Sequence, residues 1–293
     1  MCGDAGAPGF EAVHLVEAER EVGGRLRWVR RLPTLGDWGR IVDHRQVMLS
    51  KLRDRVQVAT GRRVSKADVL DYGAELVIVS TGSRWSGDGL QSATHEPIEG
   101  ASDALPYVLT PEQVMDGKRP PGSRVAVYDG EGYYVAPGIA ELLAAEGLHV
   151  RLVTSLESVS PLSDLTLEGP ILRQHLHEMG VAMMRGVTVL SVEPGRVSAE
   201  DEFEEPWSIE ADGIVLVTQQ VSDDALYHEL VGDADGLRSA GIEAVYGIGD
   251  CVAPRMISEA IFDGHRLARE IDSPDPSLPL PFDRERSLPD VRR

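Results

Sequence analysis

The stretch RVAVYDGEGYYVAPGIAELLAAEGLHVRLVT, residues 124–154, decides the fold class. It opens with the apolar run Arg124–Tyr128 and closes with a second strand-like run, His149–Thr154. Between them, Gly138–Glu146 has the composition of a helix, with a proline just before it and a glycine just after it. A strand, a helix and a strand within about thirty residues predict a βαβ unit with parallel strands.

Further apolar runs of strand length occur on both sides of this unit. They are Ala12–Glu17, Val56–Thr60, Glu75–Ser80, Gly213–Thr218 and Ala244–Ile248. Several are continuously apolar, which is typical of parallel strands that are covered on both faces. The sequence therefore predicts an α/β fold.

Two features suggest how the chain is divided into domains. Pro120-Pro121-Gly122 is a clear breaker, and Glu200–Glu205 is an acidic stretch without strand character. We expect residues 120–208 to be an inserted domain, with 1–119 and 209–271 forming one discontinuous domain around it. Residues 272–293 are rich in proline and predict an extended tail without a core of its own, either disordered or laid on a partner.

The composition excludes several classes of protein. The chain of 293 residues has 29 Lys and Arg against 48 Asp and Glu, a formal charge of −19. Such a surface repels phosphate backbones, so nucleic acid and anionic membranes are not expected partners. No apolar run approaches the roughly 18 residues of a spanning helix, and Met1–Gly6 does not resemble a signal peptide. We expect a cytoplasmic protein.

The cysteine count limits the metal chemistry. Cys2 and Cys251 are the two cysteines of the chain. Two thiols cannot make a disulfide framework, a four-thiolate zinc site or an iron–sulfur cluster. We therefore predict no metal and no iron–sulfur cluster in this chain.

Two neighbouring motifs near the N-terminus suggest a nucleotide site. Glu17 ends a predicted strand, where a carboxylate can accept hydrogen bonds from ribose hydroxyls. Gly23 and Gly24 follow, with Leu26 after them, and paired glycines let main-chain N–H groups approach a diphosphate. The alternatives are a solvent-facing acid and a plain turn.

Two more strand ends carry similar signals. Thr81 and Gly82 follow the apolar run that ends at Ser80, and Asp250 follows the late strand. An Asp between a strand and a helix can bind a ribityl or ribose hydroxyl, or it can simply cap the helix. Together with Glu17, these positions favour the binding interpretation.

A weak second nucleotide site is suggested by Gly130 and Gly132. Their spacing matches a Gly-rich fingerprint, but Val135 is too large for its sixth position. Packing without a ligand is the favoured alternative. The eight histidines are scattered, so we assign no catalytic residue.

At this point the residues resemble a known family. The runs that carry the resemblance are AVHLVEAEREVGGRL (12–26), LPTLGDW (32–38), YGAELVIVSTGSRW (72–85), LTPEQVMDGK (109–118), YGIGDCVAPRMISEAIFDGHRLAREI (246–271) and LPFDRE (280–285). They are similar, in order and spacing, to the C-terminal nucleotide-binding half of the trimethylamine and dimethylamine dehydrogenases. These are relatives of the 2,4-dienoyl-CoA-reductase-like iron–sulfur flavoproteins.

The resemblance implies a specific fold and cofactor. Members of that family begin with a TIM barrel carrying FMN and a 4Fe-4S cluster, and two glutathione-reductase-like nucleotide-binding domains follow. We therefore expect two Rossmann-like domains, of which the first is discontinuous and lacks its first β-strand and Gly-rich loop. The cofactor would be ADP or FAD. The implied contacts are Glu17 with ribose, Gly23, Gly24 and Leu26 at the diphosphate, Val64 at adenine, and Thr81, Gly82 and Asp250 closing the site.

The resemblance also implies a function. We expect a non-catalytic ADP- or FAD-binding subunit or part of an amine-dehydrogenase-like oxidoreductase of the oxidative N-demethylation type. Its expected partners are a TIM-barrel subunit with FMN and 4Fe-4S, and an electron-transfer flavoprotein. One alternative is a self-contained reductase that uses FAD and NAD(P)H. Another is a structural module with empty nucleotide sites.

Overall fold

The computed structural model describes residues 10 and 12–281. They divide into two compact units. The first unit contains the residues up to 64 and residues 84–221, and the second contains residues 65–83 and 222 onward. This division differs from the predicted insertion at 120–208, and that domain assignment stays a prediction.

The first unit holds most of the secondary structure. Its strands are β1 (Val13–Glu17), β2 (Val56–Thr60), β5 (Val108–Leu109), β6 (Arg124–Asp129), β7 (His149–Thr154), β8 (Ala182–Met184), β9 (Val187–Glu193), β10 (Arg196–Asp201), β11 (Pro206–Glu210) and β12 (Gly213–Val217). Its helices are α1 (Leu26–Val29), α2 (Gly39–Lys51), α4 (Pro111–Met115), α5 (Val135–Ala145) and α6 (Gly169–Glu178), with 3-10 turns η1 (Pro33–Trp38) and η2 (Pro161–Thr166).

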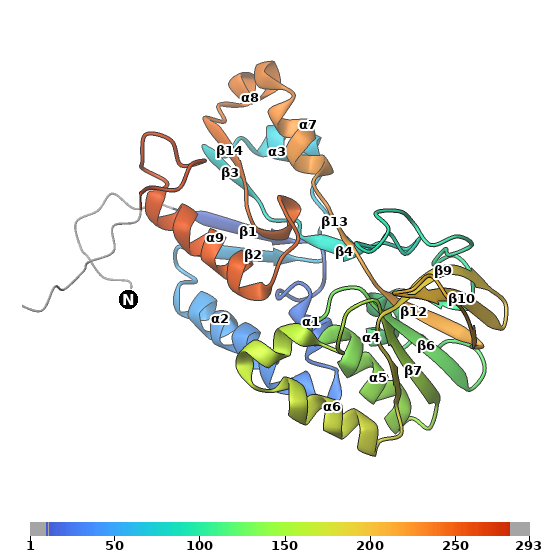
Figure 1. Ribbon diagram of the computed structural model, residues 1–293. Coiled ribbons are helices and arrows are strands. Elements are labelled where there is room, and N and C mark those ends of the chain that lie inside the picture. The colour runs from blue at the N-terminus through green and yellow to red at the C-terminus, as the bar shows by residue number, and fades with distance from the viewer. Residues whose placement is uncertain (1–9, 11, 282–293) are drawn as a thin grey trace, which may run out of the picture. The chain divides into compact units, whose positions relative to one another are not determined.

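A parallel sheet of five strands organises the first unit. Its order is β5-β12-β6-β7-β8, and every neighbouring pair is parallel. The predicted βαβ unit is confirmed as β6–α5–β7, and α5 lies against both strands (Figure 1). The helix begins at Val135, three residues before its predicted start, because Pro137 is tolerated in a first helical turn.

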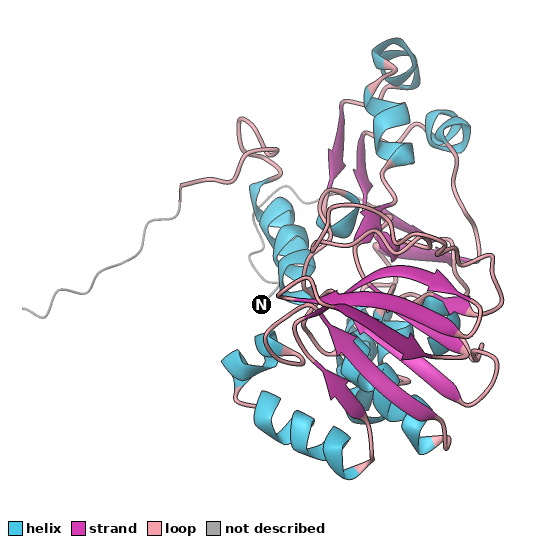
Figure 2. Cartoon of the chain, turned by 45° about the vertical axis from the view of Figure 1, so that its right-hand side comes forward, coloured by secondary structure: helices cyan, strands magenta, loops and turns pink. Residues whose placement is uncertain are grey.

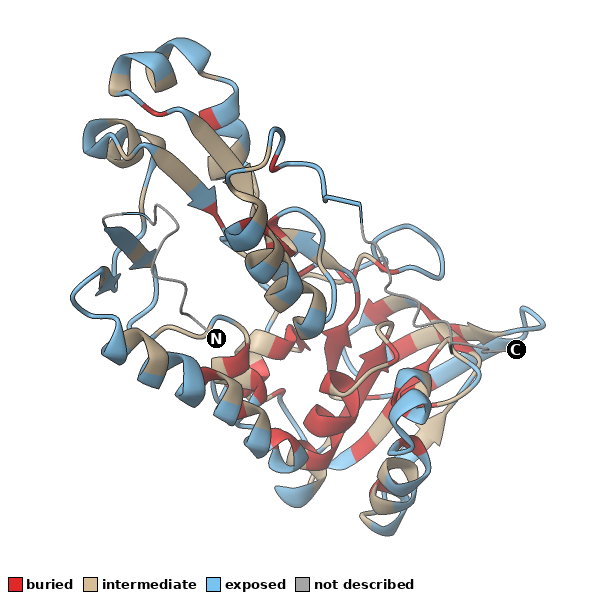
Figure 3. Ribbon diagram, turned by 90° about the vertical axis from the view of Figure 1, so that its left-hand side faces the viewer, coloured by how far each residue is buried: buried red, intermediate tan, exposed pale blue. Residues whose placement is uncertain are grey.

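Both faces of this sheet are buried, as the continuous apolar strands predict. Along β6, Val125 and Val127 join one apolar cluster, while Ala126 and Tyr128 join another. The first cluster includes residues of α1, α4, α5 and α6, and the second includes residues of β9, β10 and β11. Buried residues therefore concentrate on the strands of this sheet and on the helix beside them (Figure 3). The fold is mixed α/β with a parallel sheet.

A three-stranded antiparallel sheet of order β11-β10-β9 packs on the face of the five-stranded sheet that α5 does not cover (Figure 2). The acidic stretch Glu200–Glu205 includes the turn between β10 and β11. Asp201 stabilises this turn, because its Oδ1 accepts the N–H groups of Phe203 at 2.9 Å and Glu205 at 3.1 Å. The stretch is therefore a hairpin within the unit.

The first unit also contains a second, smaller parallel sheet. β1 and β2 pair from Val13 with Val56 to Glu17 with Thr60. The predicted absence of a preceding strand and Gly-rich loop falls on residues 1–9, outside the described residues.

The second unit is built around one parallel strand pair. Its elements are α3 (Lys66–Tyr72), β3 (Leu76–Val79), α7 (Ala225–Val231), α8 (Ala234–Ala240), β14 (Ala244–Gly247), η3 (Gly249–Cys251) and α9 (Ile257–Glu270). β3 pairs with β14 from Leu76 with Ala244 to Val79 with Gly247. The short strands β4 (Ser83–Trp85) and β13 (Gln220–Ser222) lie where the chain passes from one unit to the other.

Residues 272–281 of the proline-rich tail contain no helix or strand, and residues 282–293 lie outside the described part. Of the helices within residues 10 and 12–281, none has the length and apolar character that crossing a membrane requires.

Candidate functional site

The first predicted group lies after β1. Glu17 is the last residue of the strand, and its Oε1 accepts the N–H of Glu19 at 2.9 Å. Gly23 and Gly24 have φ values of +131° and +51°, which disfavour any side chain. An added Cβ at Gly24 would meet no atom within 4 Å, so the main chain is open to close approach there, whereas a Cβ at Gly23 would lie 3.0 Å from Cγ1 of Val42. Leu26 begins α1 and is buried.

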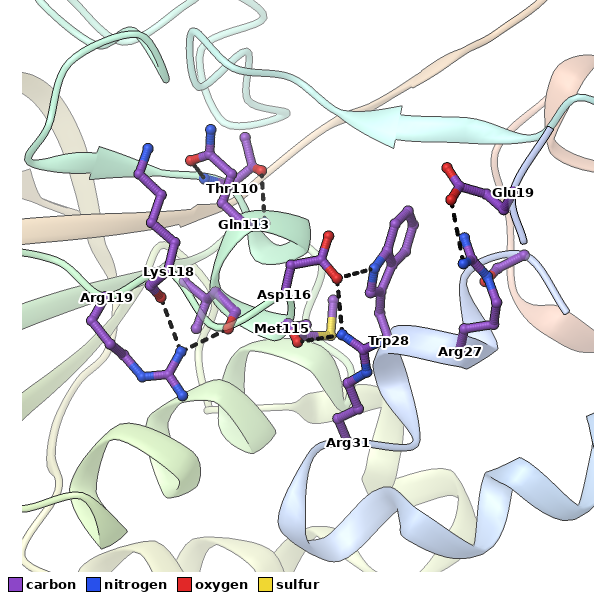
Figure 4. A network of polar contacts seen from close by, with 12 residues as sticks. Glu19, Arg27, Trp28, Arg31, Thr110, Gln113, Met115, Asp116, Lys118 and Arg119 are labelled. Atoms are coloured by element: carbon purple, nitrogen blue, oxygen red, sulfur yellow. Dashed lines mark hydrogen bonds and ion pairs between the residues drawn. The ribbon is translucent and has the colours of Figure 1, made fainter. Parts of the chain in front are cut away.

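A polar network fixes this turn against α4 (Figure 4). Asp116 Oδ1 accepts the indole N–H of Trp28 and a guanidinium N–H of Arg31, both at 2.8 Å. Arg31 also donates to the carbonyl oxygen of Met115 at 3.0 Å. Trp28 lies in α1 and Arg31 lies two residues after it, so these bonds anchor the segment after the two glycines on the C-terminal end of α4.

A hollow of about 520 Å³ lies beside α1 and α2. Its walls are charged, and its lining residues are Glu19, Arg20, Glu21, Val22, Arg27, Arg30, Arg31, Val42 and Gln46. Neither Glu17 nor the two glycines line it. The predicted residues of this group therefore surround a turn rather than this hollow.

The second predicted group lies in the second unit. Gly82 has a φ of +84°, and Thr81 before it donates its hydroxyl to the carbonyl oxygen of Asp223. The N–H of Asp223 in turn donates to the carbonyl oxygen of Gly82 at 2.9 Å. These bonds hold the end of β3 against the segment that leads into α7.

Asp250 braces the same region from η3. Its Oδ2 accepts the hydroxyl of Ser83 at 3.2 Å, and its Oδ1 accepts the N–H of Arg255 at 3.2 Å. Met256 is the N-cap of α9, so the alternative that Asp250 caps this helix is wrong. The carboxylate instead ties the start of β4 to the loop between η3 and α9.

The remaining predicted residue, Val64, is half-buried in the loop between β2 and α3. The structure therefore places five of the predicted residues in the first unit and three in the second. These are Glu17, Gly23, Gly24, Leu26 and Val64, and then Thr81, Gly82 and Asp250. A common site formed by all eight stays a prediction.

The third group surrounds the weakly predicted pair Gly130 and Gly132. Asp129 ends β6 and is fully buried, and its Oδ1 accepts the N–H groups of Glu131 at 3.1 Å and Gly132 at 2.9 Å. Its Oδ2 has no hydrogen-bond partner within the described part of the chain. Burial raises the pKa of this carboxyl from 3.8 to about 7.

Two further carboxyls lie in this region. The indole N–H of Trp85 donates to Glu131 at 2.8 Å, and the side-chain amide of Gln220 donates to the same oxygen. Glu112 accepts the main-chain N–H of Trp85 at 3.0 Å. Burial raises the pKa of both carboxyls, and the guanidinium of Arg25, 4.8 Å from the Trp85 ring centre, opposes this rise.

Trp85, Glu112, Asp129 and Glu131 are not among the site residues that the sequence predicts. The sequence feature that could have pointed to this group is the pair of acids within Asp129-Gly130-Glu131-Gly132. Within residues 10 and 12–281, no three His, Cys, Asp or Glu side chains are grouped so that they could hold a metal ion.

Comparison with known proteins finds a domain model that matches the segment containing Glu112, Asp129 and Glu131. Residues 109–230 match the OYE-like second alpha/beta domain. The match runs from β5 to α7 and includes the loop after β6.

The chain is also similar to amine-oxidising enzymes. It is 38% identical to dimethylamine dehydrogenase of Hyphomicrobium sp. (strain x) over 93% of its own length and 40% of that protein. The structure of histamine dehydrogenase from Rhizobium sp. 4-9 has a TM-score of 0.89 at 35% identity, covering 96% of this chain and 41% of that one. The amine oxidase HisD from Pseudomonas geniculata N1 has a TM-score of 0.82 at 37% identity, covering 87% and 38%. The chain thus spans about 40% of the length of the curated relatives it matches.

These findings correct two expectations. The identification of the chain as the nucleotide-binding half of the amine dehydrogenases is wrong, because the matching domain model is OYE-like. The expected non-catalytic nucleotide-binding subunit is also wrong, because the similar proteins are named as dehydrogenases and oxidases. An ADP cofactor has no support in these likenesses, whereas an oxidoreductase does.

Proposed function

We propose that this chain is part of an amine-oxidising flavoprotein and supplies its OYE-like second α/β domain. The observation that carries the proposal is the 38% identity to dimethylamine dehydrogenase over 93% of the chain. Histamine dehydrogenase and the 6-hydroxypseudooxynicotine amine oxidase, at 35% and 37% identity, also act on amines by their names. The proposed substrate class is therefore an amine with a C–H bond next to nitrogen.

The proposed reaction is a two-electron oxidation. The amine loses two electrons and two protons to become an imine, and water then releases a carbonyl compound and the smaller amine. A bound flavin would accept the electrons. We assign no residue of this chain to bond-making.

Two glycine turns are compatible with contacts to a flavin cofactor. Gly24 and Gly82 both have positive φ, and an added Cβ at either would meet no atom within 4 Å. Main-chain N–H groups at such turns can approach a phosphate or hydroxyl closely. The side chains that we propose as hydroxyl ligands are Glu17, Thr81 and Asp250.

The finer fold assignment, two Rossmann-like domains of the glutathione-reductase type, belongs to this proposal. A likeness of fold supports it, since flavoprotein disulfide reductase RclA from Escherichia coli has a TM-score of 0.54 at 15% identity. We further propose that the chain works with a TIM-barrel region that holds FMN and 4Fe-4S, and that an electron-transfer flavoprotein accepts the electrons.

The experiment is to tag the chain in its native host and purify the assembly that it forms under mild conditions. We expect a visible flavin spectrum, a flavin that mass spectrometry identifies as FMN or FAD, and reduction of an artificial dye by dimethylamine or histamine. An assembly that ignores amines, but oxidises NADPH with an activated alkene, would overturn the proposal. The relative named multifunctional alkene reductase/demethylase OYE, 29% identical, makes that outcome a real alternative.

A matched pair of variants tests the proposed ligands. Asp250→Ala removes the carboxylate at η3, and Asp235→Ala removes an exposed carboxylate from α8 of the same unit. We expect the first variant to lower the flavin content of the assembly and the second to leave it unchanged. Equal flavin content in both would remove Asp250 from the proposed site.

A further inference from the structure

The loop between β6 and α5, residues 130–134, occupies a distinctive place in the five-stranded sheet. β7 and β8 lie on one side of β6, and β12 and β5 lie on the other. The strand order therefore reverses between β6 and β12. In open parallel sheets, ligands bind at the carboxyl ends of the strands at such a point, with pyrophosphate on the loop and the helix N-terminus. This loop is where the fold would take a nicotinamide dinucleotide.

The main-chain donors of this loop already have an acceptor. The N–H groups of Glu131 and Gly132 converge on Oδ1 of Asp129, at 3.1 and 2.9 Å. Successive N–H groups that point to one oxygen form an anion-binding nest. Here the acceptor is a carboxyl oxygen of the chain itself, in the place where a phosphate oxygen would be held.

The loop after β7 covers the nest from outside. A Cβ at Gly132 would come within 2.5 Å of Cδ1 of Leu156 and 3.2 Å of Cδ of Pro161. The carbonyl oxygen of Gly132 accepts the N–H of Leu162 at 3.1 Å, and Ser160 donates its hydroxyl to the carbonyl of Tyr133 at 2.9 Å. The two loops are therefore held together over the cradle.

The acidic groups around the nest also oppose an added anion. Asp129 ends β6 just before this loop, Glu131 lies in the loop, and Glu112 faces Glu131 from α4. The guanidinium of Arg25 faces Glu131 and Glu112. A pyrophosphate in this loop would therefore lie near three carboxyl groups. The nearby cation, Arg25, already interacts with two of them, Glu112 and Glu131.

We propose that the carboxyl group of Asp129 fills the phosphate cradle of the second α/β domain and keeps it closed to nicotinamide dinucleotides. Within the described residues Oδ2 of Asp129 has no hydrogen-bond partner, so the side chain is held in the loop through Oδ1. The residues do not fit NAD(P), so Gly130 and Gly132 serve packing. This inference depends on the geometry of one loop and does not depend on the proposed amine oxidation.

The test uses the purified chain and three variants, with inorganic pyrophosphate and NADP⁺ as probes. Calorimetry gives the affinity, and the amide signals of Glu131 and Gly132 in NMR spectra locate the binding. We expect no binding to the wild-type loop. Asp129→Ala should gain about tenfold or more in affinity for pyrophosphate, with shifts at both amides. Asp37→Ala removes an exposed carboxylate elsewhere in the same unit and should gain nothing.

Three results would overturn the proposal. They are binding of either probe to the wild-type loop, no gain in Asp129→Ala, and an equal gain in Asp37→Ala. Asp129→Asn covers the case in which the alanine variant does not fold, because its amide keeps an oxygen in the cradle without the charge. Its Glu131 and Gly132 amide signals should move upfield as their acceptor weakens, and unchanged signals would also overturn the proposal.

Discussion

Asp129 and Asp250 look alike in the sequence and differ in the structure. Each follows an apolar strand and lies beside a glycine with a helix downstream. Asp129 is fully buried and accepts N–H groups from the loop that follows it, whereas Asp250 is half-buried and joins Ser83 of β4 to Arg255 in the loop before α9. An acid at the end of a strand therefore has no fixed role. Its role depends on which hydrogen-bond donors lie near it and on how far its carboxyl group is exposed to solvent.

The largest expected effect is a pH dependence of stability that comes from Asp129. Its pKa is raised from 3.8 to about 7 in the folded chain, so the folded state binds a proton that the unfolded state releases between these values. The free energy of unfolding should therefore fall as the pH rises from about 4 to 7, by about 4 kcal/mol in total. Urea unfolding of wild type and Asp129→Asn across this range measures it, because the asparagine variant lacks the dependence.

Asp233→Asn is the control for this measurement. Lys66, whose Nζ lies 2.6 Å from Oδ2 of Asp233, lowers the pKa of that carboxyl, so no comparable difference from wild type should appear between pH 4 and 7. If both asparagine variants changed the slope equally, burial would not be what separates Asp129 from Asp233.

The second prediction compares a glycine in each region. Gly132→Ala adds a Cβ at φ +69° that would lie 2.5 Å from Leu156, whereas Gly82→Ala adds one at φ +84° with no atom within 4 Å. We expect the first to cost about 2–4 kcal/mol and the second about 1 kcal/mol, the cost of the backbone conformation alone. Chemical unfolding of both variants measures the two losses of free energy. Equal losses would mean that the loop after β7 moves aside to accommodate the added Cβ.

The third prediction concerns the bracing role of Asp250. Asp250→Ala removes the acceptors of the Ser83 hydroxyl and the Arg255 N–H, and we expect a loss of about 1–2 kcal/mol. Ser83→Ala removes one of these two bonds and should cost less. Thermal unfolding of both variants distinguishes them, and a larger loss in the serine variant would contradict this account.

The smallest expected effect comes from Asp212, an acid just before β12, at the end of the five-stranded sheet where the parallel strands begin. Asp212 accepts the guanidinium of Arg124 at 2.7 Å and the N–H groups of Ser123 and Arg124 at 3.0 Å, and these bonds hold its pKa well below 3.8. The stabilisation is present above pH 4 and is lost as the pH falls below it. Asp212→Asn should therefore unfold in acid with a shallower pH dependence than wild type, and an identical acid transition would contradict the assignment.

The sequence was sufficient for the βαβ unit because its signals are local. The apolar strands β6 and β7 and the glycine at position 147 are readable within one window, and β7 agrees with its predicted bounds. The start of α5 was displaced because Pro137 looked like a first residue, although a proline is tolerated anywhere in the first turn. The antiparallel strands β9 to β11 were missed because polar residues interrupt their apolar runs and an acidic turn joins two of them.

The candidate site was harder to predict because its decisive contacts join distant residues. The partners of Glu131 are Trp85 and Gln220, far from it on either side in the chain. The Gly-rich pattern directs attention to the glycines, while the side chain that fills the loop is that of Asp129, just before the pattern begins. A glycine motif indicates which residues leave space for a ligand. Only the folded structure shows which side chain occupies that space.

The pairing of β3 with β14 has a consequence for how the protein is synthesised. β3 leaves the ribosome long before its partner, since Leu76 pairs with Ala244 and most of the other unit is encoded between them. Pairing over such a separation forms slowly. Meanwhile the apolar run Leu76–Val79 stays without a strand beside it, and exposed strand edges of this kind are prone to aggregation. The yield of folded chain should therefore depend on translation speed and on the chaperones that hold this segment.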